Sequence, residues 1–196
     1  MSTLSDIVDN SLKQYGYLIY IANQQLNLVS RKSHIQDINK QIEEAILPHS
    51  WDVCKLNSPI LDIGTGAGLP GMPIKLTDPD INMTLLDSNR RKSMFVKSII
   101  LKLKLSNVSV VCERAEVFVN KENNHNRFGT IVSRGVGNLY LMLDWAEKLL
   151  MKGGELILWK GESVKGELVE INQDIWKEPQ FLSCNSQLIL VRIVRR

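Results

Sequence analysis

The chain has 196 residues, of which 44% are hydrophobic and 23% are charged, and its net charge is +3. A chain of this length indicates one domain whose core is large enough to be stable without disulfides or bound metal. It contains no apolar stretch of about 18 residues, which argues against a membrane span, and its first residues do not resemble a secretory signal. Three scattered cysteines favour a reducing compartment over a disulfide framework or a zinc site. We therefore expect a cytoplasmic protein that binds no metal and no membrane.

Apolar residues at helical spacing predict two N-terminal helices, over 4–29 and 35–47, followed by a linker over 49–58. Short apolar runs then alternate with amphipathic stretches. The runs predict strands near 59–63, 82–87, 108–112, 129–133 and 154–159. The stretches predict helices near 70–78, 91–104, 113–120, 138–151 and 162–175. The pair Gly153-Gly154 is expected to form the turn into the fifth strand.

Two last strands, near 181–184 and 187–194, are too close together for a helical crossover and should form an antiparallel hairpin. The alternation of strands and helices before them predicts an α/β fold with a doubly wound, Rossmann-like parallel sheet. We divide the chain into an N-terminal helical extension over 1–57 and a sheet domain over 58–196. Ligands of such sheets bind at the carboxyl ends of the strands.

A glycine-rich segment follows the first predicted strand. Residues 60–71 read Ile-Leu-Asp-Ile-Gly-Thr-Gly-Ala-Gly-Leu-Pro-Gly. Such a loop lets backbone N–H groups approach a ligand closely. The dinucleotide fingerprint requires glycine at position 69, where this chain has Leu69. The spacing of Gly64, Gly66 and Gly68, with an acid two residues ahead of them, is instead typical of enzymes that use S-adenosylmethionine.

Asp87 ends the second predicted strand, 21 residues beyond Gly66, where nucleotide-binding units place an acid that binds ribose. One carboxylate can accept from two adjacent hydroxyl groups, which suits a ribose. The alternative is an acid that caps the helix over 91–104.

The ends of the later strands supply further candidates. Ala115 and Glu116 follow the third strand, beside the expected adenine, although Glu116 also suits the first turn of a helix. Arg134 ends the fourth strand, where a methyl acceptor is held, and a surface ion pair is its alternative role. Lys160 ends the fifth strand and is either a site residue or simply solvated.

Two known acceptor chemistries leave no trace in the sequence. The Asn/Asp-Pro-Pro-aromatic element of enzymes that methylate exocyclic amines does not follow the fourth strand. None of the three cysteines occupies the position of the nucleophile that cytosine C5 enzymes need. The three histidines also lack the spacing of metal ligands.

These motifs, taken in order, resemble the bacterial ribosomal RNA small-subunit methyltransferase G family, also called GidB. The resemblance covers roughly residues 20–194 and is carried by Leu61-Asp62-Ile63-Gly64-Thr65-Gly66-Ala67-Gly68-Leu69-Pro70-Gly71-Met72-Pro73, Leu85-Leu86-Asp87-Ser88, Arg114-Ala115-Glu116, Ser133-Arg134 and Lys160-Gly161. It implies a class I methyltransferase fold and methyl transfer from S-adenosylmethionine to N7 of one guanine in 16S rRNA. It also implies cofactor contacts by Gly64, Leu69, Ala115, Glu116 and Arg134.

The sequence departs from the family pattern at three places. The family's His-x-x-Asp-Ser reads Gln41-Ile42-Glu43-Glu44-Ala45 here, and its Ser-Arg-Ala reads Ser133-Arg134-Gly135. The arginine that the family often has before the last strand is replaced near Ser186-Gln187.

Guanine N7 has an in-plane lone pair and no proton, so its methylation needs no general base. Catalysis can then consist mostly of positioning, with Arg134 and Lys160 as the candidate catalytic residues. An arginine bidentate on guanine O6 and N7 would cover the nucleophile, so we expect Arg134 to hold the methionine carboxylate, a phosphate or O6 alone. Arg91 and Lys92 are expected to contact RNA phosphates, and a solvated helix face is their alternative role.

Three other functions are weighed against this one. The first is a methyltransferase that acts on a small molecule or a protein. The second is a non-catalytic module that binds S-adenosylmethionine and assists ribosome assembly. The third is a nicotinamide oxidoreductase, against which Leu69 argues. Under the favoured interpretation the partner is 16S rRNA or the small ribosomal subunit, and the protein is a monomer.

Overall fold

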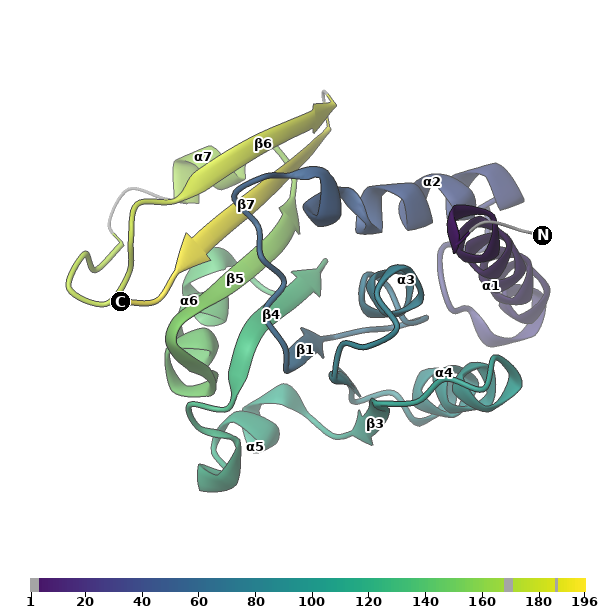
Figure 1. Ribbon diagram of the computed structural model, residues 1–196, viewed down its shortest axis with the longest axis horizontal. Coiled ribbons are helices and arrows are strands. Elements are labelled where there is room, and N and C mark those ends of the chain that lie inside the picture. Colours follow the sequence, from purple (N-terminus) through teal and green to yellow (C-terminus); the bar gives the residue numbers. More distant parts are fainter. Residues whose placement is uncertain (1–3, 168–170, 186) are drawn as a thin grey trace.

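Seven strands form one sheet in the computed structural model, which describes residues 4–167, 171–185 and 187–196 (Figure 1). The strands are β1 Ile60–Ile63, β2 Met83–Asp87, β3 Val108–Cys112, β4 Phe128–Arg134, β5 Leu150–Lys160, β6 Gln180–Asn185 and β7 Leu188–Val194. Their order is β3-β2-β1-β4-β5-β7-β6, and among these strands β7 alone runs in the opposite direction to the others. The expected α/β fold, parallel sheet and terminal hairpin are therefore confirmed.

Helices cover both faces of this sheet. They are α1 Leu4–Leu26, α2 Ile35–Ala45, α3 Gly71–Thr77, α4 Arg90–Lys102, α5 Ala115–Val119, α6 Leu139–Leu149 and α7 Val164–Glu167. Two 3₁₀-helices, Leu47–Ser50 and Glu122–Asn124, lie in the connections. No helix of the described residues is long and apolar enough to cross a membrane.

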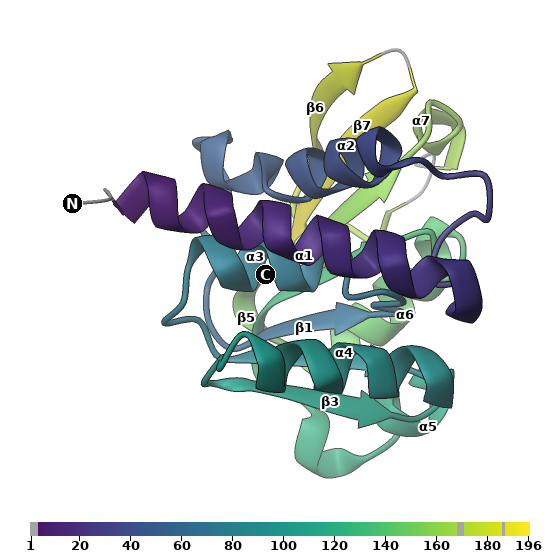
Figure 2. The ribbon, with the colours of Figure 1, turned by 90° about the vertical axis from the view of Figure 1, so that its right-hand side faces the viewer.

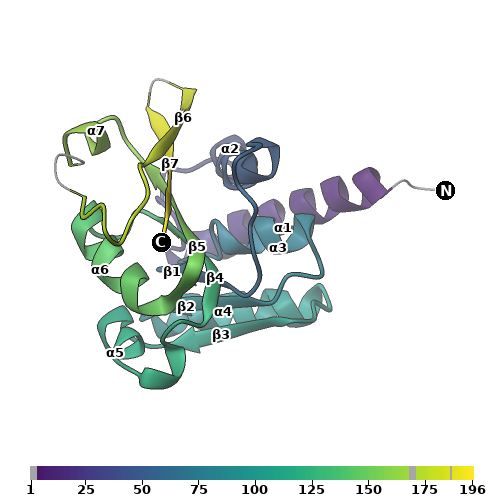
Figure 3. The same cartoon turned by 60° about the vertical axis from the view of Figure 1, so that its left-hand side comes forward.

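The two faces have separate cores. Helices α1 to α4 pack on one face, where α1 lies across α3, with α2 and α4 beside it (Figure 2). Helices α5, α6 and α7 cover the other face (Figure 3). The N-terminal helices thus share a hydrophobic core with the sheet, through buried residues such as Ile19, Ile38 and Leu85. The proposed boundary at residue 57 remains a prediction.

The residues expected to link the second helix to the first strand are fixed to the sheet. The backbone N–H groups of Lys55 and Leu56 donate to the Glu155 carboxylate at 3.0 and 2.8 Å. Glu155 is buried on β5 and also pairs with Arg192 at 2.6 Å. A buried carboxylate with three donors therefore holds this connection in place.

The expected helix over 162–175 is wrong in its last part. Helix α7 ends at Glu167, and residues 171–175 are not helical; residues 168–170 lie outside the described part. The backbone here bonds to the end of the chain instead: Arg196 N–H donates to the Ile175 carbonyl and Lys177 N–H to the Val194 carbonyl, both at 2.8 Å. These long-range partners replace the bonds that a helix would need.

The expected turn at Gly153-Gly154 is also wrong. Strand β5 already begins at Leu150, directly after α6, and the two glycines lie within it. Gly153 has a φ of +78°, and the register between β4 and β5 shifts nearby, between Phe128 and Thr130. The glycine pair marks an irregularity inside the strand.

Candidate cofactor and acceptor site

The glycine-rich loop connects β1 to α3 at the point where the strand order reverses, which is the binding place of doubly wound sheets. Gly64, Gly66 and Gly68 have φ values of +73°, +58° and +103°, which other residues rarely adopt. A Cβ atom on Gly64 would lie only 2.1 Å from the Val136 side chain. The loop backbone can therefore follow this path only with glycine at these positions.

Asp62 closes the loop from inside. Its Oδ2 accepts from the Thr65 hydroxyl at 2.6 Å and from Gly71 N–H at 2.8 Å, so it joins both ends of the loop. Its side chain is fully buried, and Oδ1 has no hydrogen-bond partner among the described residues. Burial raises the pKa of Asp62 from 3.8 to about 7, although both hydrogen bonds lower it. Asp62 therefore supports the loop and offers no exposed oxygen to a ligand.

Helix α1 supports the same loop from the other side. The Tyr15 hydroxyl donates to the Ala67 carbonyl at 2.8 Å, and the Tyr15 ring is fully buried. Burial raises the pKa of Tyr15, and the nearby Asp62 raises it further. A Cβ on Gly68 would lie 2.6 Å from this hydroxyl. Nothing in the local sequence predicts this contact, because Ala67 lies 52 positions from Tyr15 along the chain.

A cavity of about 260 Å³ lies beside the loop, at the ends of β1, β2 and β3. Apolar side chains and three carboxylates share its lining, which comprises Ile63, Gly64, Leu86, Asp87, Ser88, Glu113, Arg114, Ala115, Glu116, Val136 and Trp145. An adenine ring suits the apolar part, and ribose hydroxyls suit the carboxylates. Four of the predicted cofactor residues meet here: Gly64, Asp87, Ala115 and Glu116.

Asp87 connects the loop to helix α4. Its Oδ2 accepts from Gly66 N–H at 2.8 Å and its Oδ1 from Asn89 N–H at 2.7 Å. The cap of α4 is Asn89, which accepts from the N–H groups of Arg91 and Lys92. The carboxylate of Asp87 is thus oriented by two backbone donors and retains lone pairs for hydroxyl groups.

Two residues of the loop that were predicted to bind the cofactor, Gly68 and Leu69, lie on the side of the loop that faces away from the cavity. The N–H groups of Gly68 and Leu69 both donate to the Thr65 carbonyl at 2.8 Å. The Leu69 side chain is buried in the core on the α1 face. Neither residue lines the cavity, so within the described structure they stabilise the conformation of the loop.

Arg134 ends β4 on the face that α2 covers. Its Nη2 lies 2.7 Å from Glu44 Oε2, and its Nη1 donates to the Gln41 carbonyl at 3.4 Å. Next to it on β5, the Trp159 indole N–H donates to the Glu44 carbonyl at 2.8 Å. The arginine is therefore held by α2, two residues beyond the last register pair of β4 with β1, and it is not among the residues that line the cavity.

Lys160 lies at the end of β5. Its ammonium group donates to the Gly137 carbonyl at 2.9 Å and so reaches the turn that follows β4. Gly135 and Gly137 in that turn have φ values of +74° and +52°. The structure thus brings Lys160 to the turn beside Arg134.

Arg91 and Lys92 begin α4, but they differ in position. Arg91 is exposed, whereas Lys92 is partly buried. The Lys92 ammonium lies 4.0 Å from the point where a Cβ of Gly66 would be. Lys92 is therefore a neighbour of the glycine loop, and Arg91 faces solvent.

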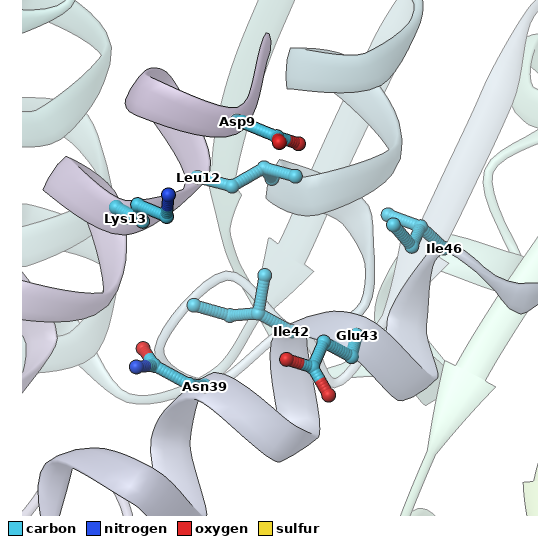
Figure 4. Close-up of a pocket in the computed structure, with 7 residues that line it drawn as sticks. All are labelled: Asp9, Leu12, Lys13, Asn39, Ile42, Glu43 and Ile46. Atoms are coloured by element: carbon cyan, nitrogen blue, oxygen red, sulfur yellow. The ribbon is translucent and has the colours of Figure 1, made fainter. Parts of the chain in front are cut away.

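A second cavity, of about 230 Å³, lies between α1 and α2 (Figure 4). Its lining is Asp9, Leu12, Lys13, Asn39, Ile42, Glu43 and Ile46. None of the predicted site residues is among them. The described residues also contain no cluster of three or more His, Cys, Asp or Glu side chains that could hold a metal ion.

Comparison with known proteins gives a consistent result. The family model GidB, described as rRNA small subunit methyltransferase G, matches residues 8–188. The chain is 36% identical over 164 residues to Ribosomal RNA small subunit methyltransferase G of Clostridium botulinum, covering 76% of this chain and 69% of that protein. Ribosomal RNA small subunit methyltransferase G of Clostridium tetani is 32% identical, covering 82% of this chain and 67% of that protein.

Solved structures share the fold. M. jannaschii TYW2 in complex with AdoMet superimposes with a TM-score of 0.58 at 15% identity, covering 79% of this chain and 74% of that one. The architecture is that of class I methyltransferases that depend on S-adenosylmethionine, and the cofactor expected from the loop is confirmed.

Proposed function

Since the chain belongs to the rRNA small subunit methyltransferase G (GidB) family, we propose that it methylates N7 of one guanine in the 16S rRNA of the small ribosomal subunit. The observation that carries the proposal is the cavity beside the glycine loop, with Asp87 and Glu116 on its wall and Arg134 on the neighbouring strand. We place the reaction in the cytoplasm, where ribosomal subunits are, and take the protein to act as a monomer.

The residues of the cavity suit S-adenosylmethionine. In this proposal Asp87 accepts from the ribose hydroxyls, and Ala115 and Glu116 contact the adenine end. The backbone at Gly64 and Gly66 passes close to the methionine part, and Arg134 pairs with the methionine carboxylate. When bound, the cofactor supplies a methyl group on a positively charged sulfur.

The acceptor side needs little acid–base chemistry. Guanine N7 attacks through a lone pair that carries no proton, so no side chain has to remove one. The protein must hold N7 in line with the bond from sulfur to methyl. This requirement agrees with the residues proposed for the acceptor side: Arg134 and Lys160 are basic side chains, and the nearby carboxylate of Asp62 is enclosed by the loop.

Lys160 and the start of α4 are assigned to the RNA. Lys160 holds the turn after β4 that borders the acceptor, and it contacts the target nucleotide from there. Arg91 and Lys92 bind phosphates near the cofactor cavity. Phosphate contacts of this kind position an RNA without reading its sequence.

The test is methyl transfer from tritium-labelled S-adenosylmethionine to small ribosomal subunits, followed by nucleoside analysis. We expect label in 7-methylguanosine alone. Label in another nucleoside, or in protein, would contradict the proposed acceptor. Cofactor binding by calorimetry with no transfer to subunits or to free 16S rRNA would instead support a non-catalytic module.

A further inference from the structure

Helix α2 ends beside Arg134, and its last turn supplies the contacts that orient this arginine. The Glu44 carbonyl, in the last turn of α2, has no partner within the helix, because the residue four positions later is Pro48, which has no N–H. The Trp159 indole N–H donates to it instead. Arg134 donates to the Gln41 carbonyl, one turn earlier. Arg134 and Trp159 are register partners on β4 and β5. One pair of neighbouring strand residues therefore holds the end of α2 over the sheet.

The Glu44 side chain adds a charge to this junction. Its carboxylate lies 2.7 Å from Arg134, and the two side chains are only 13% and 25% exposed. An ion pair that is hydrogen-bonded and partly shielded from water is stronger than one on the surface. The two contacts involve both terminal nitrogens of a rigid, planar group. The short contact with Glu44 and the longer one with Gln41 orient the guanidinium and leave N–H groups for a further anion.

We propose that Glu44 is a positioning residue of the cofactor site: its carboxylate holds Arg134 in the orientation in which the guanidinium binds the methionine carboxylate. The inference rests on the proposed role of Arg134. A guanidinium released from Glu44 occupies several rotamers, and ordering it again on binding weakens the cofactor's affinity. Helix α2 thus contributes to cofactor binding although none of its residues lines the cofactor cavity.

A purely structural ion pair would have a different signature. It would lower the stability of the fold when broken, and the affinity for the cofactor would follow only through loss of folded protein. A positioning role instead links the effect of Glu44 on affinity to the presence of Arg134. The charge of Glu44, and not merely its size, should matter.

The test is calorimetric titration of the whole protein with S-adenosylhomocysteine, which keeps the amino-acid part of the cofactor. Glu44→Gln removes the charge and keeps the side-chain size, and we expect its Kd to rise about tenfold to a hundredfold. Glu44→Asp keeps the charge and should retain most of the affinity. The matched control is Glu43→Gln, which removes the same charge from the adjacent, exposed position beside the α1–α2 cavity (Figure 4); its Kd should equal that of the unmodified protein.

The decisive comparison repeats Glu44→Gln in an Arg134→Ala background. There the second substitution should change the Kd no further, because the two residues act together. An unchanged Kd for Glu44→Gln, or an equal loss with and without Arg134, would overturn the proposal. If Glu44→Gln does not fold, Glu44→Asp is compared in the same two backgrounds, and a change independent of Arg134 again rejects it.

This experiment does not depend on the identity of the methyl acceptor. If the protein binds S-adenosylhomocysteine but transfers no methyl group to 16S rRNA, the proposed function is contradicted. The same titration then still tests the role of Glu44.

Discussion

The two halves of the site are held by contacts of very different range along the chain. On the side proposed for the adenosine, Asp87 accepts from Asn89, two residues away, and from Gly66, 21 residues away. On the side proposed for the methionine, Glu44 reaches Arg134 over 90 residues. Strand ends and the loop between them build the first half, whereas the second half also needs a helix from the N-terminal extension.

This difference shows which parts of the site the sequence motifs describe and which parts they leave out. The motifs at the strand ends contain the residues that line the cavity and the backbone that orients them. They also contain Arg134, whereas Glu44, which supports it, lies in the stretch where the sequence departs from the family pattern. Changes in the two halves should therefore have separable effects on cofactor affinity, stability and transfer.

The largest effect is expected for Arg134→Ala on the methionine side. Loss of the guanidinium removes a charged donor from the site, and transfer should fall by roughly 100- to 1000-fold while the fold survives. Methyl transfer to small ribosomal subunits measures this. The control is Arg127→Ala, an exposed arginine just before the other end of β4. Near-normal turnover of Arg134→Ala would sink the assigned role.

Asp87→Asn tests the adenosine side. The amide keeps the shape but loses the charge and one pair of acceptor sites, so the Kd of S-adenosylhomocysteine should rise by about 10- to 100-fold. Calorimetry at a fixed pH gives this value, with exposed Asp80→Asn as the control. An affinity equal to that of the unmodified protein would show that Asp87 only connects the loop to α4.

Tyr15→Phe asks how strongly α1 supports the glycine loop. The substitution leaves the buried Ala67 carbonyl without its donor, which should lower the free energy of unfolding by about 1–3 kcal/mol. Urea unfolding measures the loss, and a several-fold weaker binding of S-adenosylhomocysteine should accompany it. Tyr17→Phe is the control because the Tyr17 side chain is 58% exposed. Equal stabilities for the two variants would contradict a supporting role.

Arg91→Ala probes the RNA face next to the adenosine side. Removing one phosphate contact should lower the slope of log affinity against log salt by about 1, with little change in cofactor affinity. Filter binding of 16S rRNA over a range of salt concentrations gives the slope. Lys102→Ala, at the far end of α4, serves as the control. The same experiment on Lys92→Ala shows whether its place beside Gly66 adds a loss of cofactor affinity. Unchanged slopes would leave α4 as a solvated helix face.

The smallest effect is expected for Asp62→Asn, on β1 beside the glycine-rich loop that both halves share. Because burial raises the pKa of Asp62 above its ordinary value, the folded state binds a proton more tightly than the unfolded chain does. The free energy of unfolding should therefore decrease as the pH rises from about 4 to about 7, and Asp62→Asn should remove this part of the slope. Urea unfolding across that range tests it, with exposed Asp52→Asn as the control. An identical pH dependence in all three proteins would contradict the assignment.

The sequence predicted the sheet and the glycine-rich segment well, because each depends on local patterns, and four of the residues predicted to bind the cofactor line one cavity. Alternating apolar runs mark the strands, and the acids and glycines follow them directly. The contacts of Tyr15 and Glu44 could not be predicted, since no periodicity relates a helix residue to a strand 90 positions away. At Glu44 the sequence departs from the family's aspartate, yet an acid remains and pairs with Arg134.

The helix expected over 162–175 failed for a similar reason. Its amphipathic pattern is real, but Ile175 and Trp176 pair with the end of the chain, which the local sequence does not reveal. Leu69 was assigned to the cofactor through the motif, and the structure places its side chain in the core. A motif predicts which residues lie near the site, but it does not predict on which side of the loop each side chain lies.

The most direct measurement of the function is a map of 7-methylguanosine in 16S rRNA from cells with and without this protein. We expect one modified guanine to be fully methylated in its presence and unmethylated in its absence, with methylation restored by the unmodified gene and not by Arg134→Ala. An identical methylation pattern in both kinds of cell would contradict the proposed function.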